Sequence, residues 1–316
     1  MTFSVVAFDD ATGALGIAVA SHSVAVGGRV PHVSGGVGAI ATQALTDTTY
    51  GTRLLEGLAA RRDPGDVLQS IASADGGAEH RQVAVIDGKG RSAGISGRRC
   101  LPFSAQQMSR HASAQGNLLA SLAVVPAMID AFHNALVSPN RNSMGGDLVH
   151  RLMSSLEAGD RAGGDVRGAR SAAVMVAWPD GARLDARIDD DANPVARLGP
   201  LLNRSLDQHV VGAAQRAALL GSTAADASTL ELALAAVPGR TQLEERRLWR
   251  AVLLFRCGKV DAANQLLGHG LRTAWPMVID RLVEDGLLPR DASPDSAPAG
   301  TDDDAPTPAP RKRARR

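Results

Sequence analysis

The sequence predicts an α+β protein in which antiparallel sheets lie between helix layers, followed by a small all-α unit. Two observations favour this class. Up to about residue 205, pairs of strand-like apolar runs alternate with pairs of helix-like segments, rather than strand and helix one by one. Beyond that point the composition changes to Ala- and Leu-rich helical text. With 316 residues, 44% of them apolar, the chain is long enough to bury a substantial core.

Three β-hairpins are expected where apolar runs are separated by turn-forming residues. Their strands are predicted at 2–8 with 14–20, at 82–86 with 91–95, and at 171–178 with 183–188. The tip Asp87-Gly88-Lys89-Gly90 shows the signal well, because Asp and Gly tolerate the positive φ angles of tight hairpin turns.

Helical spacing of apolar residues predicts two helix pairs between these hairpins. The first pair is expected at 50–61 and 64–74, where Pro64 suits the first turn of its helix. The second pair is expected at 119–137 and 147–158. After Pro194, further helices are predicted at 206–220, 223–236, 243–257, 260–267 and 275–284.

These elements divide the chain into a layered unit over 1–205, a helical unit over 206–290 and a tail over 291–316. The stretch 249–267 resembles one tetratricopeptide-type helix hairpin, because Ala262 and Ala263 would let two helices approach closely. The tail has no aliphatic residue larger than Ala, so it cannot bury enough surface to offset its ordering entropy. We therefore expect the tail to be disordered.

Composition and charge argue against several classes of function. The chain has 34 Lys and Arg against 33 Asp and Glu, so no strong field favours nucleic acid or an anionic membrane. No window approaches eighteen uninterrupted apolar residues, and Asp9 and Asp10 stand where a signal peptide would be apolar. We expect a cytoplasmic protein. The two cysteines, Cys100 and Cys257, are too far apart in the sequence for a CxxC zinc motif.

No cofactor or metal is expected from the motifs. Residues 36–41 fit a loose GxGxxA fingerprint, but the preceding 29–34 do not resemble the buried parallel strand that a dinucleotide site requires. Backbone N–H groups of Gly36 or Gly38 remain candidates for contacting a substrate anion. The eight histidines are scattered, and His22 and His32, nearest to the Gly-rich loops, are candidates for substrate contact.

The N-terminus offers the strongest catalytic hypothesis. Thr2 is a small residue after which the initiator Met1 is commonly removed, which would leave a free Thr heading the first strand. Its hydroxyl would then lie beside its own α-amino group, whose unperturbed pKa of about 7.7–8.0 suits a general base. Ser4 shares a strand face with Thr2 and either orients it or replaces it as nucleophile. Cys100 is a third candidate, better explained as a buried structural cysteine.

Polar residues elsewhere could complete such a site. Asn117 follows Gln115-Gly116 and offers an amide N–H to an oxyanion, an alternative to the backbone of Gly36 or Gly38. Asp165, Arg167 and Arg170 precede a predicted strand, where they form either an ion-pair cluster or a site for a substrate carboxylate.

Several separated motifs resemble one bacterial family, the domain of unknown function 1028, whose members look like N-terminal-nucleophile (Ntn) hydrolases. The motifs lie at 2–7, 16–21, 36–44, 115–117, 163–168, 171–173 and 187–190. The resemblance spans about 2–205 and implies an αββα sandwich with a nucleophile at the start of the first strand. It adds Ser21 and Gln43 to the candidates for substrate binding, and His22 stands where the family often has Arg.

The sequence is therefore compatible with two functions. The first is an amide-bond hydrolase that acts on a small peptide-like or amidated molecule through an acyl-enzyme on Thr2. The second is a non-catalytic binding or assembly protein, with the helical unit as a surface for a protein partner or a second copy. The candidate catalytic residues are Thr2, Ser4 and Asn117. The candidate substrate-binding residues are Ser21, His22, Gly36, Gly38, Gln43, Asp165, Arg167 and Arg170.

Overall fold

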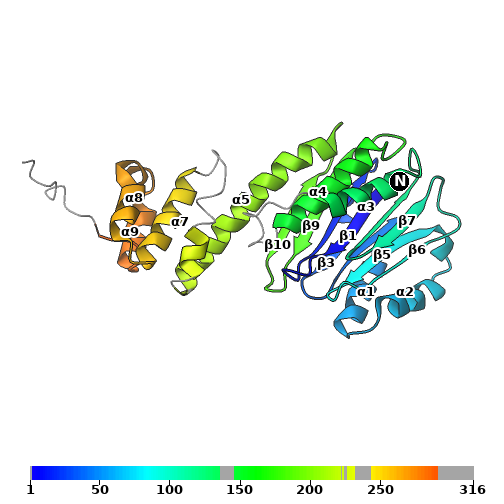
Figure 1. Ribbon diagram of the computed structural model, residues 1–316, viewed down its shortest axis with the longest axis horizontal. Helices are drawn as coiled ribbons and strands as arrows, with labels where there is room; N and C mark the ends of the chain where they lie inside the picture. Colours follow the sequence, from blue (N-terminus) through cyan, green and yellow to red (C-terminus); the bar gives the residue numbers. More distant parts are fainter. Residues whose placement is uncertain (1, 136–145, 222, 224–225, 232–242, 291–316) are drawn as a thin grey trace, which may run out of the picture.

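The computed structural model describes residues 2–135, 146–221, 223, 226–231 and 243–290. Up to β10 and the first turns of α5 the chain forms four layers, with two antiparallel sheets packed face to face and helices on both outer sides (Figure 1). The α+β class and the antiparallel sheets are confirmed.

The larger sheet has six strands in the order β10-β9-β2-β1-β8-β7. Its central strand β1 pairs with β2 on one side and β8 on the other, so the first strand of the chain lies in the middle of the sheet. The strands are β1 (Thr2–Phe8), β2 (Leu15–Ser21), β7 (Ala105–Ser109), β8 (Ala112–Asn117), β9 (Ser171–Ala177) and β10 (Arg183–Ile188).

The smaller sheet has four strands in the order β3-β4-β5-β6. The strands are β3 (Pro31–Ser34), β4 (Gly38–Ala44), β5 (Arg81–Asp87) and β6 (Ser92–Ser96). Short 3₁₀ turns, η1 (Val26–Gly28) and η2 (Ala78–His80), precede β3 and β5. The three predicted hairpins are confirmed as β1–β2, β5–β6 and β9–β10, whereas β3–β4 and β7–β8 were missed.

Helices α1 (Thr49–Ala59) and α2 (Pro64–Ser73) cover the smaller sheet, close to their predicted positions. The start of α2 follows its sequence directly, because Asp63 accepts a hydrogen bond from the Gly65 N–H at 2.9 Å and Pro64 needs no N–H partner. Helices α3 (Val124–Asn134) and α4 (Gly146–Arg161) cover the larger sheet. No helix in the described ranges has the length and apolar character needed to cross a membrane.

Helix α3 begins five residues later than predicted. Leu118 has a left-handed backbone conformation and Leu119 forms a β-bridge with Asp165, so 119–123 are held outside the helix. The predicted end of this helix at 137, part of the predicted helix 223–236 and the predicted disordered tail at 291–316 lie outside the described residues.

Helix α5 (Pro194–Leu220) is continuous through the domain boundary predicted at residue 205. Its first half contributes Leu198 to the core above the larger sheet, and its second half packs against α7 (Leu243–Arg256) (Figure 1). Helix α7 packs in turn against α8 (Val260–Ala274), which contacts α9 (Pro276–Glu284), and these helices share a second core. His209, beyond the boundary, stacks on Trp178 with ring centroids 4.7 Å apart. The two cores are therefore separate, but one helix belongs to both.

Candidate functional site

The space between the two sheets is apolar at one end and polar at the other. Alternate residues of β1 face this space, so Thr2 and Ser4 lie at the polar end, whereas Val6 and Phe8 lie at the apolar end. We call the polar end the interior polar cluster. Its seven members are Thr2, Ser4, Ser21, Gln43, Gln82, Gln115 and Asn117, each at most 6% exposed.

Strand register places Thr2 in the middle of this cluster. Thr2 lies opposite Ser21 of β2 on one side and opposite Asn117 of β8 on the other. Its Oγ1 donates to Ser21 Oγ at 3.2 Å, and the same Ser21 oxygen accepts the Ser23 N–H at 3.1 Å. The structure thus brings the predicted nucleophile next to two predicted site residues from neighbouring strands.

Gln43 joins the two sheets at this point. Its Nε2 donates to the backbone carbonyl oxygen of Thr2 at 3.1 Å and to Gln82 Oε1 at 2.8 Å. Its Oε1 accepts from Ser4 Oγ at 2.7 Å. Gln43 therefore fixes both polar residues of β1 from the opposite sheet, and the predicted grouping of Thr2, Ser4 and Gln43 is present in the structure.

Gln82 is the centre of the remaining hydrogen bonds and was missed from the sequence. Its Oε1 accepts from Asn117 Nδ2 at 3.0 Å as well as from Gln43, and its Nε2 donates to Ser96 Oγ at 2.8 Å and to the Gly116 carbonyl at 3.0 Å. An amide directly before the apolar run Val83–Ile86 was the available signal, because an unpaired buried amide is costly and must have partners.

Asn117 lies beside Thr2 as an oxyanion donor would require. Its side-chain amide carries two N–H donors, and one of them points to Gln82 Oε1. Gln115, two residues earlier on the same face of β8, donates from Nε2 to the Ala41 carbonyl of the opposite sheet at 3.0 Å. The C-terminal end of β8 is therefore held against the smaller sheet by two amides.

The backbone turns sharply directly after Gln43, which contacts Thr2, and directly after Asn117, which lies opposite Thr2 in the sheet. Ala44, after Gln43, has φ 69°, and Leu118, after Asn117, has φ 49°. A left-handed conformation costs a residue with a Cβ about 1–2 kcal/mol, and such strain is concentrated at functional sites. These two turns end β4 and β8 at the same end of the sandwich.

The glycine-rich loop 163–168 supports the end of β2. Gly163, Gly164 and Gly168 have positive φ angles that bring Asp165 beneath the strand end. Asp165 Oδ2 accepts the His22 N–H at 2.8 Å, while its Oδ1 accepts the Arg167 N–H at 2.9 Å. Because its side chain is fully buried, Asp165 holds the segment that carries Ser21 in place.

Both arginines predicted to recognise a substrate carboxylate have carboxylate partners within the chain. Arg170 binds Asp190 Oδ1 through Nε at 2.8 Å and Nη2 at 2.5 Å, and its backbone N–H donates to the Ser21 carbonyl at 2.7 Å. Arg167 Nε lies 3.5 Å from Asp165 Oδ1. His22 Nδ1 is 2.9 Å from the Gly168 carbonyl oxygen, so the imidazole of His22 is also hydrogen-bonded to this loop.

Two other predicted contacts lie away from Thr2. Gly38 pairs with Asp87 at the opposite end of β4 from Gln43, and Gly36 lies in the turn that precedes it. The structure therefore does not bring these glycines to the interior polar cluster, because four residues of extended strand, 39–42, separate Gly38 from Gln43.

The contacts of His32 and Cys100 are those of residues that stabilise the fold. The His32 ring packs directly against Gly51 of α1 on the outer side of the smaller sheet, where burial lowers its pKa. Cys100 Sγ donates to the Arg81 carbonyl at 3.3 Å, and burial raises the pKa of the thiol. A raised pKa disfavours the thiolate that a nucleophile needs.

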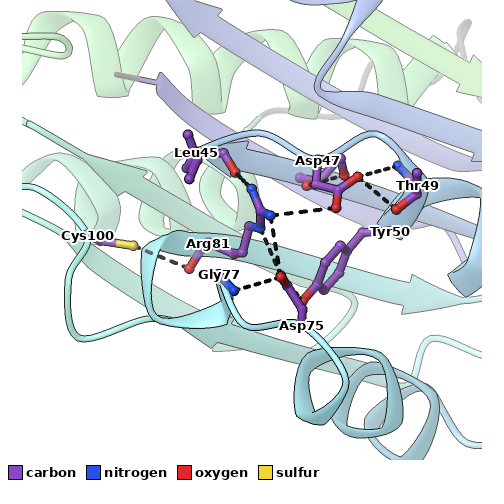
Figure 2. Close-up of polar contacts among 9 residues, drawn as sticks. Leu45, Asp47, Thr49, Tyr50, Asp75, Gly77, Arg81 and Cys100 are labelled. Atoms are coloured by element: carbon purple, nitrogen blue, oxygen red, sulfur yellow. Dashed lines mark hydrogen bonds and ion pairs between the residues drawn. The ribbon is translucent and has the colours of Figure 1, made fainter.

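A charged cluster braces the strand ends that carry Gln43 and Gln82 (Figure 2). We call Asp47, Tyr50, Asp75 and Arg81 the Arg81 cluster. Arg81 Nε donates to Asp75 Oδ2 at 2.9 Å and its Nη1 donates to the Leu45 carbonyl at 2.6 Å, next to strained Ala44. The hydrogen bonds to Asp75 lower its pKa to about 2, and burial beside Asp75 raises the pKa of Tyr50 to about 12.

The described residues hold no group of three or more His, Cys, Asp or Glu side chains arranged for a metal ion. The interior polar cluster consists of hydroxyls and amides, which suit hydrogen-bond donation and nucleophilic attack rather than metal binding.

Comparison with known proteins relates this chain to a family model and to a solved structure. Residues 2–198 match the family model described as a family of unknown function, DUF1028. The crystal structure of a protein of the same family model from Silicibacter pomeroyi is 32% identical, with a TM-score of 0.58 over 65% of this chain and 85% of that chain. No curated protein matches this chain.

Proposed function

Because this chain belongs to the family of unknown function DUF1028, we propose its activity from the site itself: hydrolysis of an amide bond in a small peptide-like or amidated molecule, with Thr2 as an Ntn-type nucleophile. The observation that carries the proposal is the place of Thr2. It heads the central strand, faces the opposite sheet, and has its hydroxyl bonded to Ser21 and its carbonyl bonded to Gln43.

In the proposed reaction, removal of Met1 frees the α-amino group of Thr2, which takes the proton from Oγ1 as this oxygen attacks the substrate carbonyl. The C–N bond then breaks, and the amine leaves with that proton. The acyl group stays on Thr2 as an ester, and water hydrolyses the ester to release the acid. Asn117 is the proposed donor to the oxyanion of each tetrahedral intermediate.

The surroundings of Thr2 support this chemistry in two ways. Gln43 fixes the Thr2 carbonyl, so the backbone that carries both nucleophile and base is held in one orientation. The layered arrangement of two antiparallel sheets between helices is the one expected for an Ntn-type sandwich, and it leaves the start of the first strand at one end of the space between the sheets.

One observation favours the non-catalytic alternative. The side chains of Gln43, Gln82 and Asn117 bond to one another, which is also how a purely structural polar core is built. In that case the protein binds or assembles without turnover, and the helices α7–α9 are the surface for a partner.

The test combines the mass of the mature protein with turnover of small amides. We expect the purified protein to lack Met1 and to release amine from at least one member of an amide panel, detected by mass spectrometry. Thr2→Ala should remove this activity, whereas Thr12→Ala, the same kind of change in the β1–β2 turn, should leave it unchanged. Activity that survives Thr2→Ala, or that is found with Met1 retained, contradicts the proposal.

A further inference from the structure

Large apolar side chains are exposed at the same end of the sandwich as Thr2. Leu45, Leu101, Phe103 and Val166 are each between 53% and 61% exposed. They come from three segments: the end of β4, the β6–β7 connection, which supplies Leu101 and Phe103, and the loop between α4 and β9. Leu118 lies among them. We call these four residues the apolar rim.

Backbone hydrogen bonds gather three members of the apolar rim around one point. The Leu118 N–H donates to the Leu101 carbonyl at 3.2 Å, and the Val166 N–H donates to the Leu118 carbonyl at 3.3 Å. The Leu119 N–H donates to the Phe103 carbonyl at 3.0 Å. Leu118 directly follows Asn117, and Asn117 lies opposite Thr2 in the sheet. The apolar rim therefore begins one residue along the chain from the strand partner of the proposed nucleophile.

The fourth member lies on the other sheet. Leu45 follows Ala44 at the end of β4, and Arg81 holds its carbonyl at 2.6 Å (Figure 2). Because Gln43 of the same strand end contacts the Thr2 carbonyl, Leu45 stands at the same end of the space between the sheets. Both sheets therefore contribute apolar surface beside the interior polar cluster.

Three arginines at this end have carboxylate partners within the chain. Arg167 is held by Asp165, Arg170 by Asp190, and Arg81 by Asp75. A substrate carboxylate would have to compete with these internal partners, whereas an aliphatic or aromatic group gains by covering exposed apolar surface. The pairing and the rim together favour an uncharged substrate.

We propose that the apolar rim binds an uncharged aliphatic or aromatic acyl group of the substrate amide. This inference rests on the proposed function, because the acyl group is the part that stays on Thr2 Oγ1 after the C–N bond breaks. In this proposal its substituent extends past Asn117 and Leu118 to the rim. The substrate class is thus an amide of an apolar carboxylic acid, rather than an amide with an anionic acyl chain.

The experiment compares two β-lactones that differ only at the end of the acyl chain, one alkyl and one ending in a carboxylate. We expect acylation of the protein, followed by intact mass, to be on the order of tenfold faster for the alkyl lactone, the ratio that corresponds to ~1.4 kcal/mol. Leu101→Ser and Val166→Ser should each lower that preference several-fold. Leu220→Ser, at an 82% exposed residue of α5, is the matched control and should leave the preference unchanged.

A second arm requires no reaction. Binding of octanamide and of an anionic amide of equal length to the Thr2→Ala variant is followed by NMR titration. Tighter binding of octanamide than of the anionic amide, weakened by Leu101→Ser and Val166→Ser, supports the role of the rim. If this result is found while no lactone acylates Thr2, the proposed function is contradicted but the rim is not. Equal or faster acylation by the anionic lactone overturns the inference while leaving the function intact. A dimer that Val166→Ser dissociates also overturns it, because the rim is then an interface between copies.

Discussion

The two ends of the space between the sheets are filled in opposite ways by the same strands. On β5, Ile86 lies in an apolar cluster with Phe8 and Ile17, whereas Gln82, four residues earlier on the same face, bonds to Gln43 and Asn117. Apolar packing is non-directional and tolerates a change of shape of similar volume. A buried amide network is directional, and each member depends on its partners.

The two ends therefore contribute differently: the apolar end stabilises the fold, and the polar end fixes the orientation of particular side chains. At the apolar end, burial of ordinary side chains holds the sheets together. At the polar end, the sheets are held by amide hydrogen bonds, and the chain leaves that end through strained Ala44 and Leu118. A protein that needed only stability would extend the apolar packing, so the polar end is where we place the function.

The largest effect on stability is expected at Gln82. Gln82→Leu leaves the amide groups of Gln43 and Asn117 and the Gly116 carbonyl without their partner, at about 1–3 kcal/mol for each unsatisfied group. We expect the free energy of unfolding to fall by about 3–5 kcal/mol in denaturant titrations. Ile86→Leu introduces the same side chain on the same strand and should cost less than about 1.5 kcal/mol. Equal costs for the two variants would remove the distinction between the ends.

A smaller effect, on catalysis, is expected at Asn117. Asn117→Ala should lower kcat by on the order of 10²-fold, about 2.7 kcal/mol, if its amide donates to the oxyanion. Ser4→Ala should lower kcat less, because Ser4 contacts Gln43 and orients the site. Asn134→Ala, at an exposed position in α3, is the control. Steady-state kinetics on the best amide of the panel measures all three, and the reverse order of Ser4 and Asn117 would contradict these roles.

The Arg81 cluster should make stability depend on pH. Asp75→Asn at neutral pH should cost about 2 kcal/mol, the scale of a hydrogen bond to a charged group. The folded pKa of about 2 lies below the unfolded value of about 3.9, so this stabilisation is present above pH ~4 and is lost as the pH falls toward 2.

Denaturant titrations of wild type and Asp75→Asn at several pH values test this dependence. The stability difference between them should shrink from pH 4 downward. Asp130→Asn, at an exposed residue of α3, should show no such trend. A difference that stays constant down to pH 2 would mean that the carboxylate charge of Asp75 is not what braces the strand ends.

The smallest effect concerns the helical region. A chain that ends at residue 205 keeps Val195, Leu198 and Leu202 in the first core but loses the stack of His209 on Trp178. We expect it to fold with a loss of about 1 kcal/mol, the scale of one aromatic pair. Circular dichroism and denaturant titration measure this, and an insoluble or molten product would show that the first core depends on the second.

The sequence predicts the apolar parts of the fold well and the polar parts poorly. Hairpins β1–β2, β5–β6 and β9–β10 were found because their strands are apolar and their turns contain Asp and Gly. Strands β7 and β8 were missed because Gln106, Gln115 and Asn117 occupy positions where a buried strand would normally be apolar. Two of these residues, Gln115 and Asn117, belong to the interior polar cluster, so the candidate site itself made strand β8 hard to predict.

For the candidate site, proximity along a strand was predictable but partners across the sheets were not. Period 2 gave Thr2 and Ser4 a common face, and that face is present. Gln82 could not be placed, because its role depends on the register between β4, β5 and β8, which no local pattern encodes. Gly36 and Gly38 were grouped with the site on their glycine content, although the length of β4 separates them from Gln43.

The central claim is that Thr2 is the nucleophile, and the most direct measurement is to locate the acyl group after treatment of the wild-type protein with an alkyl β-lactone. Proteolysis followed by tandem mass spectrometry identifies the residue that carries the acyl group. The account predicts an ester on Thr2 in an N-terminal peptide that lacks Met1. An adduct on Ser4 or Cys100, or on Thr2 in a peptide that retains Met1, would contradict it.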